Sequence, residues 1–172
     1  MRLFCALRLH HDVVEQLVRW QQAELRGGRL VPADNLHVTL AFLGSRPADE
    51  LPAIAGALRA SAVGTDGVRL KVRDYRETRS VGMLTLDDDE GGRATALAAR
   101  LHAGLEELGV YRREARPWLP HLTVLRFKER PRLEPSLPDL GEVMPSDAAV
   151  FISRLRPGGA QYEVLEIAAL GG

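Results

Sequence analysis

The feature that most constrains the fold is a strand pattern that occurs twice. The segments "LHVTLAFLG" (36–44) and "PHLTVLRFK" (120–128) each place a histidine two residues before a threonine within an apolar run. Side chains at positions i and i+2 of a strand point to the same side of a sheet. Each segment therefore predicts a strand that presents His and Thr together on one face. The fold therefore has to contain two strands that each present a His-Thr pair on one face of a sheet.

Strand and helix patterns alternate around these two segments. Alternating or continuous apolar runs predict strands, whereas apolar spacings of three and four between capping residues and glycines predict helices. The expected strands are residues 2–9, 35–44, 67–75, 80–88, 120–128, 147–157 and 160–170, and the expected helices are residues 11–28, 45–64 and 90–110. A helix precedes each His-x-Thr strand, which indicates an internal duplication in one compact α+β unit with short linkers.

Composition narrows the classes of function open to the chain. The 172 residues carry 23 Lys and Arg against 23 Asp and Glu, so no net field attracts nucleic acid and local donors must hold any anionic substrate. The single cysteine, Cys5, excludes an internal disulfide and a cysteine-based zinc site. No segment has the pattern of a signal peptide or a membrane span. These features predict a soluble, monomeric, cytoplasmic protein that does not contact membranes.

The repeated motif suits chemistry at phosphorus. An imidazole exchanges a proton near physiological pH, and a threonine hydroxyl can hold a phosphoryl oxygen. Two His-Thr pairs that face each other across a cleft would supply a base behind an attacking water and an acid behind a leaving oxygen, without a metal. A single His-x-Thr is more simply a partly buried strand residue. Its repetition on equivalent strands favours catalysis.

These segments, with "RLFCALRL" (2–9) and "SRLRPGGAQYEVLEIAAL" (153–170), resemble the 2H phosphoesterase superfamily, and within it the RNA 2′,3′-cyclic phosphodiesterases, historically called 2′-5′ RNA ligases. The resemblance covers nearly the whole chain. It implies a bilobal α+β fold with pseudo-two-fold duplicated α/β lobes and antiparallel sheets around a central cleft. The expected domain is a single one over residues 1–172, made of two interleaved lobes. The implied reaction converts a terminal 2′,3′-cyclic phosphate of RNA or nucleotides to a 2′-phosphate, with no metal and no other cofactor.

The resemblance also implies roles for the four motif residues. His37 is expected to be the general acid for the departing 3′-oxygen, and His121 the general base that deprotonates water. Thr39 and Thr123 are expected to donate hydrogen bonds to phosphate oxygens. Because one imidazole must be protonated while the other is neutral, the rate is expected to follow a bell-shaped pH profile.

Two further substrate-binding residues follow the motifs. Arg126 matches an arginine that follows the second motif histidine by five residues in the family that the chain resembles. A guanidinium there would offset the negative charge of a phosphate. Simple alternation sets Arg126 on the face opposite His121 unless the strand twists or bulges after Leu125. Phe42 lies at the equivalent place after His37 and is expected to offer a ring to a nucleobase, with a place in the core as the alternative.

Other motifs are weaker. The acidic run "DDDE" (87–90) is expected to cap a helix N-terminus rather than to bind a metal. His102 is expected on the surface of its helix. No serine-hydrolase elbow or P-loop is present. Three alternatives stay open: a non-catalytic nucleotide- or RNA-binding module, a phosphodiesterase of another cyclic phosphoester, and RNA joining as a minor reverse reaction.

Overall fold

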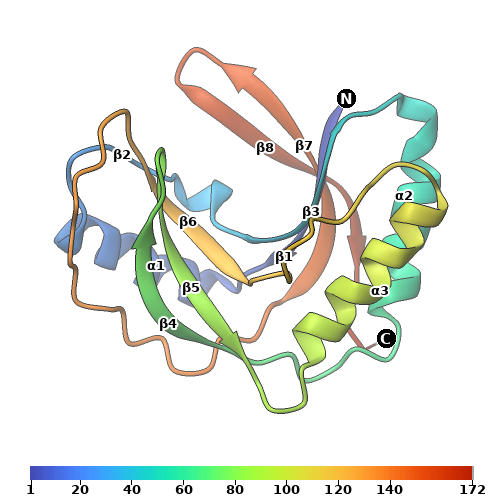
Figure 1. Cartoon of the computed structure of the whole chain (residues 1–172), viewed down its shortest axis with the longest axis horizontal. Helices are drawn as coiled ribbons and strands as arrows, with labels where there is room; N and C mark the ends of the chain where they lie inside the picture. The colour runs from blue at the N-terminus through green and yellow to red at the C-terminus, as the bar shows by residue number, and fades with distance from the viewer. Residues whose placement is uncertain (172) are drawn as a thin grey trace.

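A computed structural model of the chain describes residues 1–171, which form eight strands and three α-helices (Figure 1). The strands are β1 (Arg2–Arg8), β2 (Arg29–Leu30), β3 (Val38–Ser45), β4 (Leu70–Glu77), β5 (Val81–Asp88), β6 (His121–Arg126), β7 (Asp147–Arg156) and β8 (Gly159–Ala168). The helices are α1 (His11–Glu24), α2 (Leu51–Ala62) and α3 (Arg93–Glu107). Short 3₁₀ turns at Ala33–Asn35 and Ala48–Glu50 lead into β3 and α2.

The strands form one curled antiparallel sheet in the order β4-β5-β6-β3-β1-β7-β8, with β2 paired to the outer part of β6. The predicted α+β class with antiparallel strands is confirmed. The two His-x-Thr strands are neighbours at the centre of the sheet, but β3 and β6 share a single backbone pairing, Val38 with Leu122. Beyond this pairing the two strands diverge (Figure 1).

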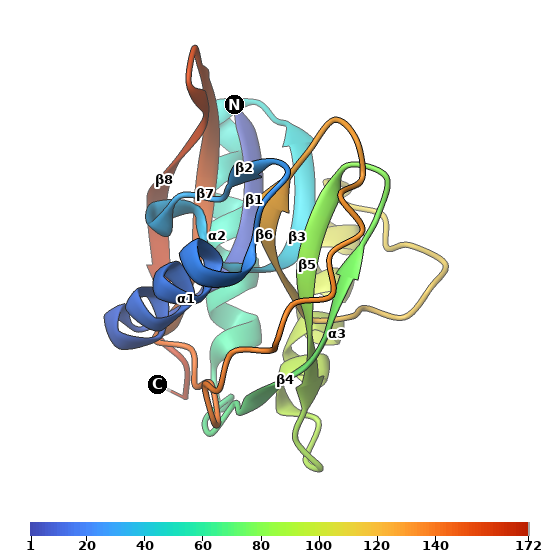
Figure 2. The same cartoon turned by 90° about the vertical axis from the view of Figure 1, so that its left-hand side faces the viewer.

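The helices cover one side of the sheet and enclose the main core. α2 and α3 pack against each other, with α2 on β7 and β8 and α3 on β3 and β5. α1 lies apart from that pair in Figure 1 and in front of α2 in Figure 2, and it contributes Leu17 and Trp20 to the same core. Among residues 1–171, no helix combines the length and the apolarity that crossing a membrane requires.

The first helix ends earlier than the glycine pair at 27–28 suggested. α1 stops at Glu24 because Leu25 adopts an extended conformation and is buried in the core. Gly28 then allows a close approach between two backbones, since a Cβ at this position would collide with the carbonyl oxygen of Arg126. This approach forms the short strand β2, which the sequence pattern did not predict.

His102 is buried, so its predicted surface position is wrong. Only 6% of the residue is exposed, and it lies on the face of α3 that also buries Leu101 and Leu105. Its Nε2 donates a hydrogen bond of 2.7 Å to the carbonyl of Leu40, and its ring lies 4.9 Å from that of Tyr111. His102 therefore links α3 to the covered face of β3 through a buried hydrogen bond.

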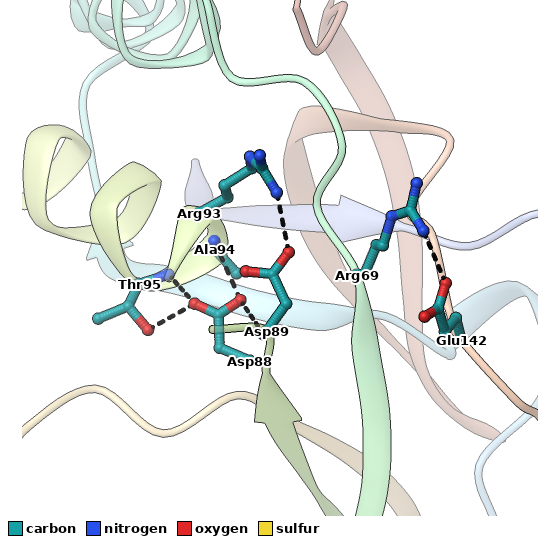
Figure 3. Close-up of polar contacts among 7 residues, drawn as sticks. All are labelled: Arg69, Asp88, Asp89, Arg93, Ala94, Thr95 and Glu142. Atoms are coloured by element: carbon teal, nitrogen blue, oxygen red, sulfur yellow. Dashed lines mark hydrogen bonds and ion pairs between the residues drawn. The ribbon is translucent and has the colours of Figure 1, made fainter. Parts of the chain in front are cut away.

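The acidic run at 87–90 caps α3, as predicted (Figure 3). The Asp88 carboxylate accepts hydrogen bonds from the backbone N–H groups of Ala94 and Thr95, at 3.4 and 2.8 Å, and from the Thr95 hydroxyl at 2.8 Å. Asp89 pairs with Arg93 at 3.0 Å. Within residues 1–171, no group of three or more His, Cys, Asp or Glu side chains is arranged to hold a metal ion.

Replacing Asp88 by alanine is expected to lower the free energy of unfolding by about 1–2 kcal/mol, because two N–H groups in the first turn of α3 lose their acceptor. Urea unfolding of the variant measures the loss. Asp87→Ala is the matched control, since Asp87 is exposed and lies 3.8 Å from Arg73, a surface ion pair of little energetic value. Equal stability of the two variants would contradict the capping role.

Candidate active site

The pairing between β3 and β6 gathers the four motif side chains. Val38 and Leu122, the residues that pair, are both fully buried in the main core. Residues that flank them on each strand point to the opposite, open face of the sheet. The pairing of β6 with β5 agrees, because Leu122 pairs there with buried Leu84. The residues brought together on the open face are His37, Thr39, His121 and Thr123.

The four side chains repeat around the Val38–Leu122 pairing. Antiparallel register, continued by one residue in each direction, sets His37 across from Thr123 and His121 across from Thr39. The two histidines thus occupy diagonal corners of one small patch, with a threonine at each of the other corners. This is the two-fold arrangement that the repeated motif predicted.

Both imidazoles are held in the same way. His37 Nδ1 lies 2.8 Å from the carbonyl of Asn35, and His121 Nδ1 lies 2.9 Å from the carbonyl of Leu119. A carbonyl accepts only, so each Nδ1 carries a proton, and a ring that is neutral has its lone pair on Nε2. His37 Nε2 lies 2.8 Å from the Thr39 hydroxyl, which donates to it in this state. The repeated carbonyl two residues upstream turns both Nε2 atoms away from the backbone.

His37 is neutral in the free protein. Burial lowers its pKa to about 4, although the Asn35 carbonyl acts in the opposite direction. The positive charges of His121 and Arg126 lower the pKa further. An anion bound against the ring would favour the imidazolium. A protonated His37 is therefore expected to form together with the bound anion.

Binding of sulfate, a dianion across this pH range, is expected to be accompanied by proton uptake at His37. Since the pKa of His37 in the free protein is about 4 and rises in the complex, sulfate affinity falls as pH increases above about 4. Calorimetry at pH 6 in buffers of different ionisation enthalpy measures the uptake. His37→Gln is expected to take up fewer protons, by up to one per site. Equal uptake by both proteins would contradict the assignment.

Arg126 reaches the open face through a β-bulge. The register between β6 and β5 skips Val124, and one extra residue shifts the alternation of faces by one. Arg126 consequently lies on the same side as His121 and Thr123, where simple alternation would have set it opposite. Its charge lowers the pKa of His37, which agrees with a cation on this side of the sheet.

β3 has a bulge at the matching position. Its register against β1 skips Leu40, so that Phe42 lies on the same face as Thr39. Phe42 is 50% exposed and stacks on Phe4 with ring centroids 5.6 Å apart. The alternative that Phe42 belongs to the core is therefore wrong. The guanidinium carbon of Arg2 lies 5.5 Å from the centroid of the Phe42 ring, so a planar group would stack there in place of that flexible side chain.

His37 rests on an aromatic cluster that is separate from the main core. Phe4 and Phe151 stack with centroids 4.9 Å apart and lie 4.9 and 6.0 Å from the His37 ring. Tyr162 meets the same ring edge-on at 5.5 Å. Phe4 is fully buried and acts through packing. Packing against this cluster restricts the His37 imidazole to one orientation.

Known proteins are similar to this chain in sequence and in fold. A relative from Thermus thermophilus named RNA 2′,3′-cyclic phosphodiesterase is 35% identical over 185 residues, covering 100% of this chain and 91% of its own length. A crystal structure of a Thermus thermophilus protein aligns with a TM-score of 0.83 at 35% identity, covering 100% and 99% of the two chains. Escherichia coli LigT, solved in complex with 3′-AMP, aligns with a TM-score of 0.83 at 27% identity, covering 99% and 98%.

A curled antiparallel sheet with two His-x-Thr strands that meet at its centre defines the class of the 2H phosphoesterases. Within that class, the sequence profile of the 2′-5′ RNA ligase superfamily matches residues 10–156. The chain belongs to this family. The resemblance noted from the two motifs and the terminal strands is confirmed.

Proposed function

We propose that the chain hydrolyses the terminal 2′,3′-cyclic phosphate of RNA or nucleotides to a 2′-phosphate, without a metal ion. The observation that carries the proposal is the diagonal pair of imidazoles, each fixed through Nδ1, which leaves Nε2 as the nitrogen that can exchange a proton with the substrate or water. The activity in the names of the relatives supports the substrate class.

The proposed reaction is an in-line displacement. His121 Nε2 takes a proton from water as the water oxygen bonds to phosphorus. The bond from phosphorus to the 3′-oxygen breaks, and His37 Nε2 donates its proton to that oxygen. The two rings end with exchanged protonation states, which solvent restores. A base and an acid of this kind typically contribute about 10²–10⁴-fold each.

The threonines bind the phosphate in this scheme. In the free protein the Thr39 hydroxyl donates to His37 Nε2. Once His37 is protonated, Nε2 no longer accepts from Thr39, so the hydroxyl hydrogen of Thr39 is released toward a phosphate oxygen while Nε2–H is directed to the 3′-oxygen. Thr123, across from His37, binds a second oxygen. Arg126 offsets the negative charge, and Phe42 stacks against the base.

An assay with 2′,3′-cyclic AMP in the presence of EDTA tests the proposal. The expected product is 2′-AMP alone, identified by ³¹P NMR, with a rate unchanged by EDTA and a bell-shaped pH profile. Formation of 3′-AMP or loss of activity with EDTA would contradict it. Binding without turnover would instead indicate a nucleotide-binding module, and turnover restricted to other cyclic phosphoesters would reassign the substrate. The monomeric state and the cytoplasmic location stay predictions.

A further inference from the structure

Both bulges beside the site are contacted from behind by a buried polar side chain. Gln21 of α1 donates from Nε2 to the carbonyl of Val124 at 2.8 Å, and its residue is 1% exposed. His102 of α3 donates from Nε2 to the carbonyl of Leu40 at 2.7 Å and is 6% exposed. Val124 and Leu40 are the third residues after the two motif histidines. The same device therefore occurs in both halves of the sheet, built from different residue types on different helices.

These carbonyls lie where the central ladder ends. β3 and β6 pair only at Val38 and Leu122, so further along neither strand satisfies the other's backbone. The Val124 carbonyl accepts the backbone N–H of Val31 at 3.1 Å in addition to the Gln21 amide. A buried carbonyl has two lone pairs to satisfy, so Gln21 supplies a second donor to Val124 and His102 supplies a donor to Leu40. Gln21 also donates to the carbonyl of Val31 at 3.0 Å, so that both amide hydrogens are engaged. The side chain ties the segment after β2 to the bulge in β6.

We propose that Gln21 and His102 are positioning residues, which keep the two bulges formed and thereby keep Arg126 and Phe42 on the open face. Gln21 acts through Arg126, and His102 acts through Phe42. Without the bulge, the alternation of faces would return each of these side chains to the covered side of the sheet. The inference rests on the proposed function for its kinetic readout, and on the geometry alone for its spectroscopic one.

The test for Gln21 is a double-mutant cycle with Arg126. Gln21→Met keeps an unbranched side chain of similar length and removes the donor. It is expected to lower kcat/KM for 2′,3′-cyclic AMP by about tenfold, and by less than about twofold in the Arg126→Ala background, because the two changes act through one group. Gln22→Met, an exposed position one residue further along α1, is the matched control and is expected to match the wild type.

The second readout does not depend on turnover. The charge of Arg126 lowers the pKa of His37, so NMR titration of the His37 ring reports whether the guanidinium still faces it. Gln21→Met and Arg126→Ala are each expected to raise this pKa, and the double variant is expected to raise it no further than Arg126→Ala. Purely structural destabilisation would change the melting temperature in both backgrounds and leave the His37 titration as in the wild type.

The β3 side is tested in parallel. His102→Met is expected to raise KM about tenfold, which is the order of effect expected for one lost stacking contact. His102→Gln retains a donor of similar reach and is expected to keep KM near the wild-type value. In the Phe42→Ala background, His102→Met is expected to have no further effect.

Additive losses in both cycles, or an unchanged His37 pKa in Gln21→Met, would overturn the proposal. If Gln21→Met does not fold, Gln21→Asn, with an amide one methylene shorter, replaces it in the same cycle. A wild type that does not hydrolyse 2′,3′-cyclic AMP would refute the proposed function, and the His37 titration would still decide the role of Gln21.

Discussion

Replacing either open-face histidine by alanine is expected to lower kcat for 2′,3′-cyclic AMP by about 10²–10⁴-fold. His121→Ala removes the group that accepts a proton from water, and His37→Ala removes the group that returns a proton to the 3′-oxygen. The double variant is expected to lose little more than either single one, because the two rings act in one concerted step. Steady-state kinetics with a circular-dichroism melt of each variant separates chemistry from folding.

The controls for this prediction come from the same chain. His37 packs on Phe4, so His37→Gln accompanies the alanine variant and preserves more of that contact. His11→Ala removes an exposed histidine at the start of α1, which lies 2.9 Å from Glu15, and is expected to keep full activity. More than one tenth of wild-type kcat in a folded His37 or His121 variant would refute the assigned roles.

Arg126→Ala is expected to lower kcat/KM by about 10²-fold, the typical loss when a donor to developing charge is removed from an active site. Sulfate affinity is expected to fall with it. Arg126→Lys is expected to recover only part of the activity, because an ammonium group lacks the planar fork that binds two phosphate oxygens at once.

Arg19→Ala is the control for this second prediction. Arg19 is an exposed arginine on α1, a helix that packs on the covered side of the sheet, and its loss is expected to leave kcat/KM unchanged. Activity of Arg126→Ala within about twofold of the wild type would show that the bulge in β6 has no catalytic consequence.

The strand period was sufficient to predict the paired faces of His37 and Thr39 and of His121 and Thr123. It follows from backbone geometry alone and does not depend on the rest of the fold. The position of Arg126 could not be predicted in this way, because a bulge is decided by pairing with neighbouring strands. One local sign was present: each strand has two adjacent buried apolar residues, at 40–41 and 124–125, where strict alternation allows one.

Helix patterns were informative where all positions of a face were weighed together. His102 shares its face with Ala98, Leu101 and Leu105, spaced by three and four residues, and this spacing indicates burial. The end of α1 was less predictable. Leu25 leaves the helix to fill the core, and the glycines that follow serve the approach of β2 to β6, a long-range contact with no local signature.

The single pairing of Val38 with Leu122 has a mechanical consequence. If the two halves of the sheet moved relative to each other, their displacement would be smallest at this pair and would grow with distance from it. His37 and His121 are direct neighbours of the paired residues, whereas Phe42 and Arg126 each lie four residues beyond the paired residue of their own strand. A rocking motion that opened the outer parts of the two strands for a larger nucleobase would leave the spacing of the two imidazoles almost unchanged. In the proposed reaction, such a motion would admit bases of different size without changing the distance between the two imidazoles.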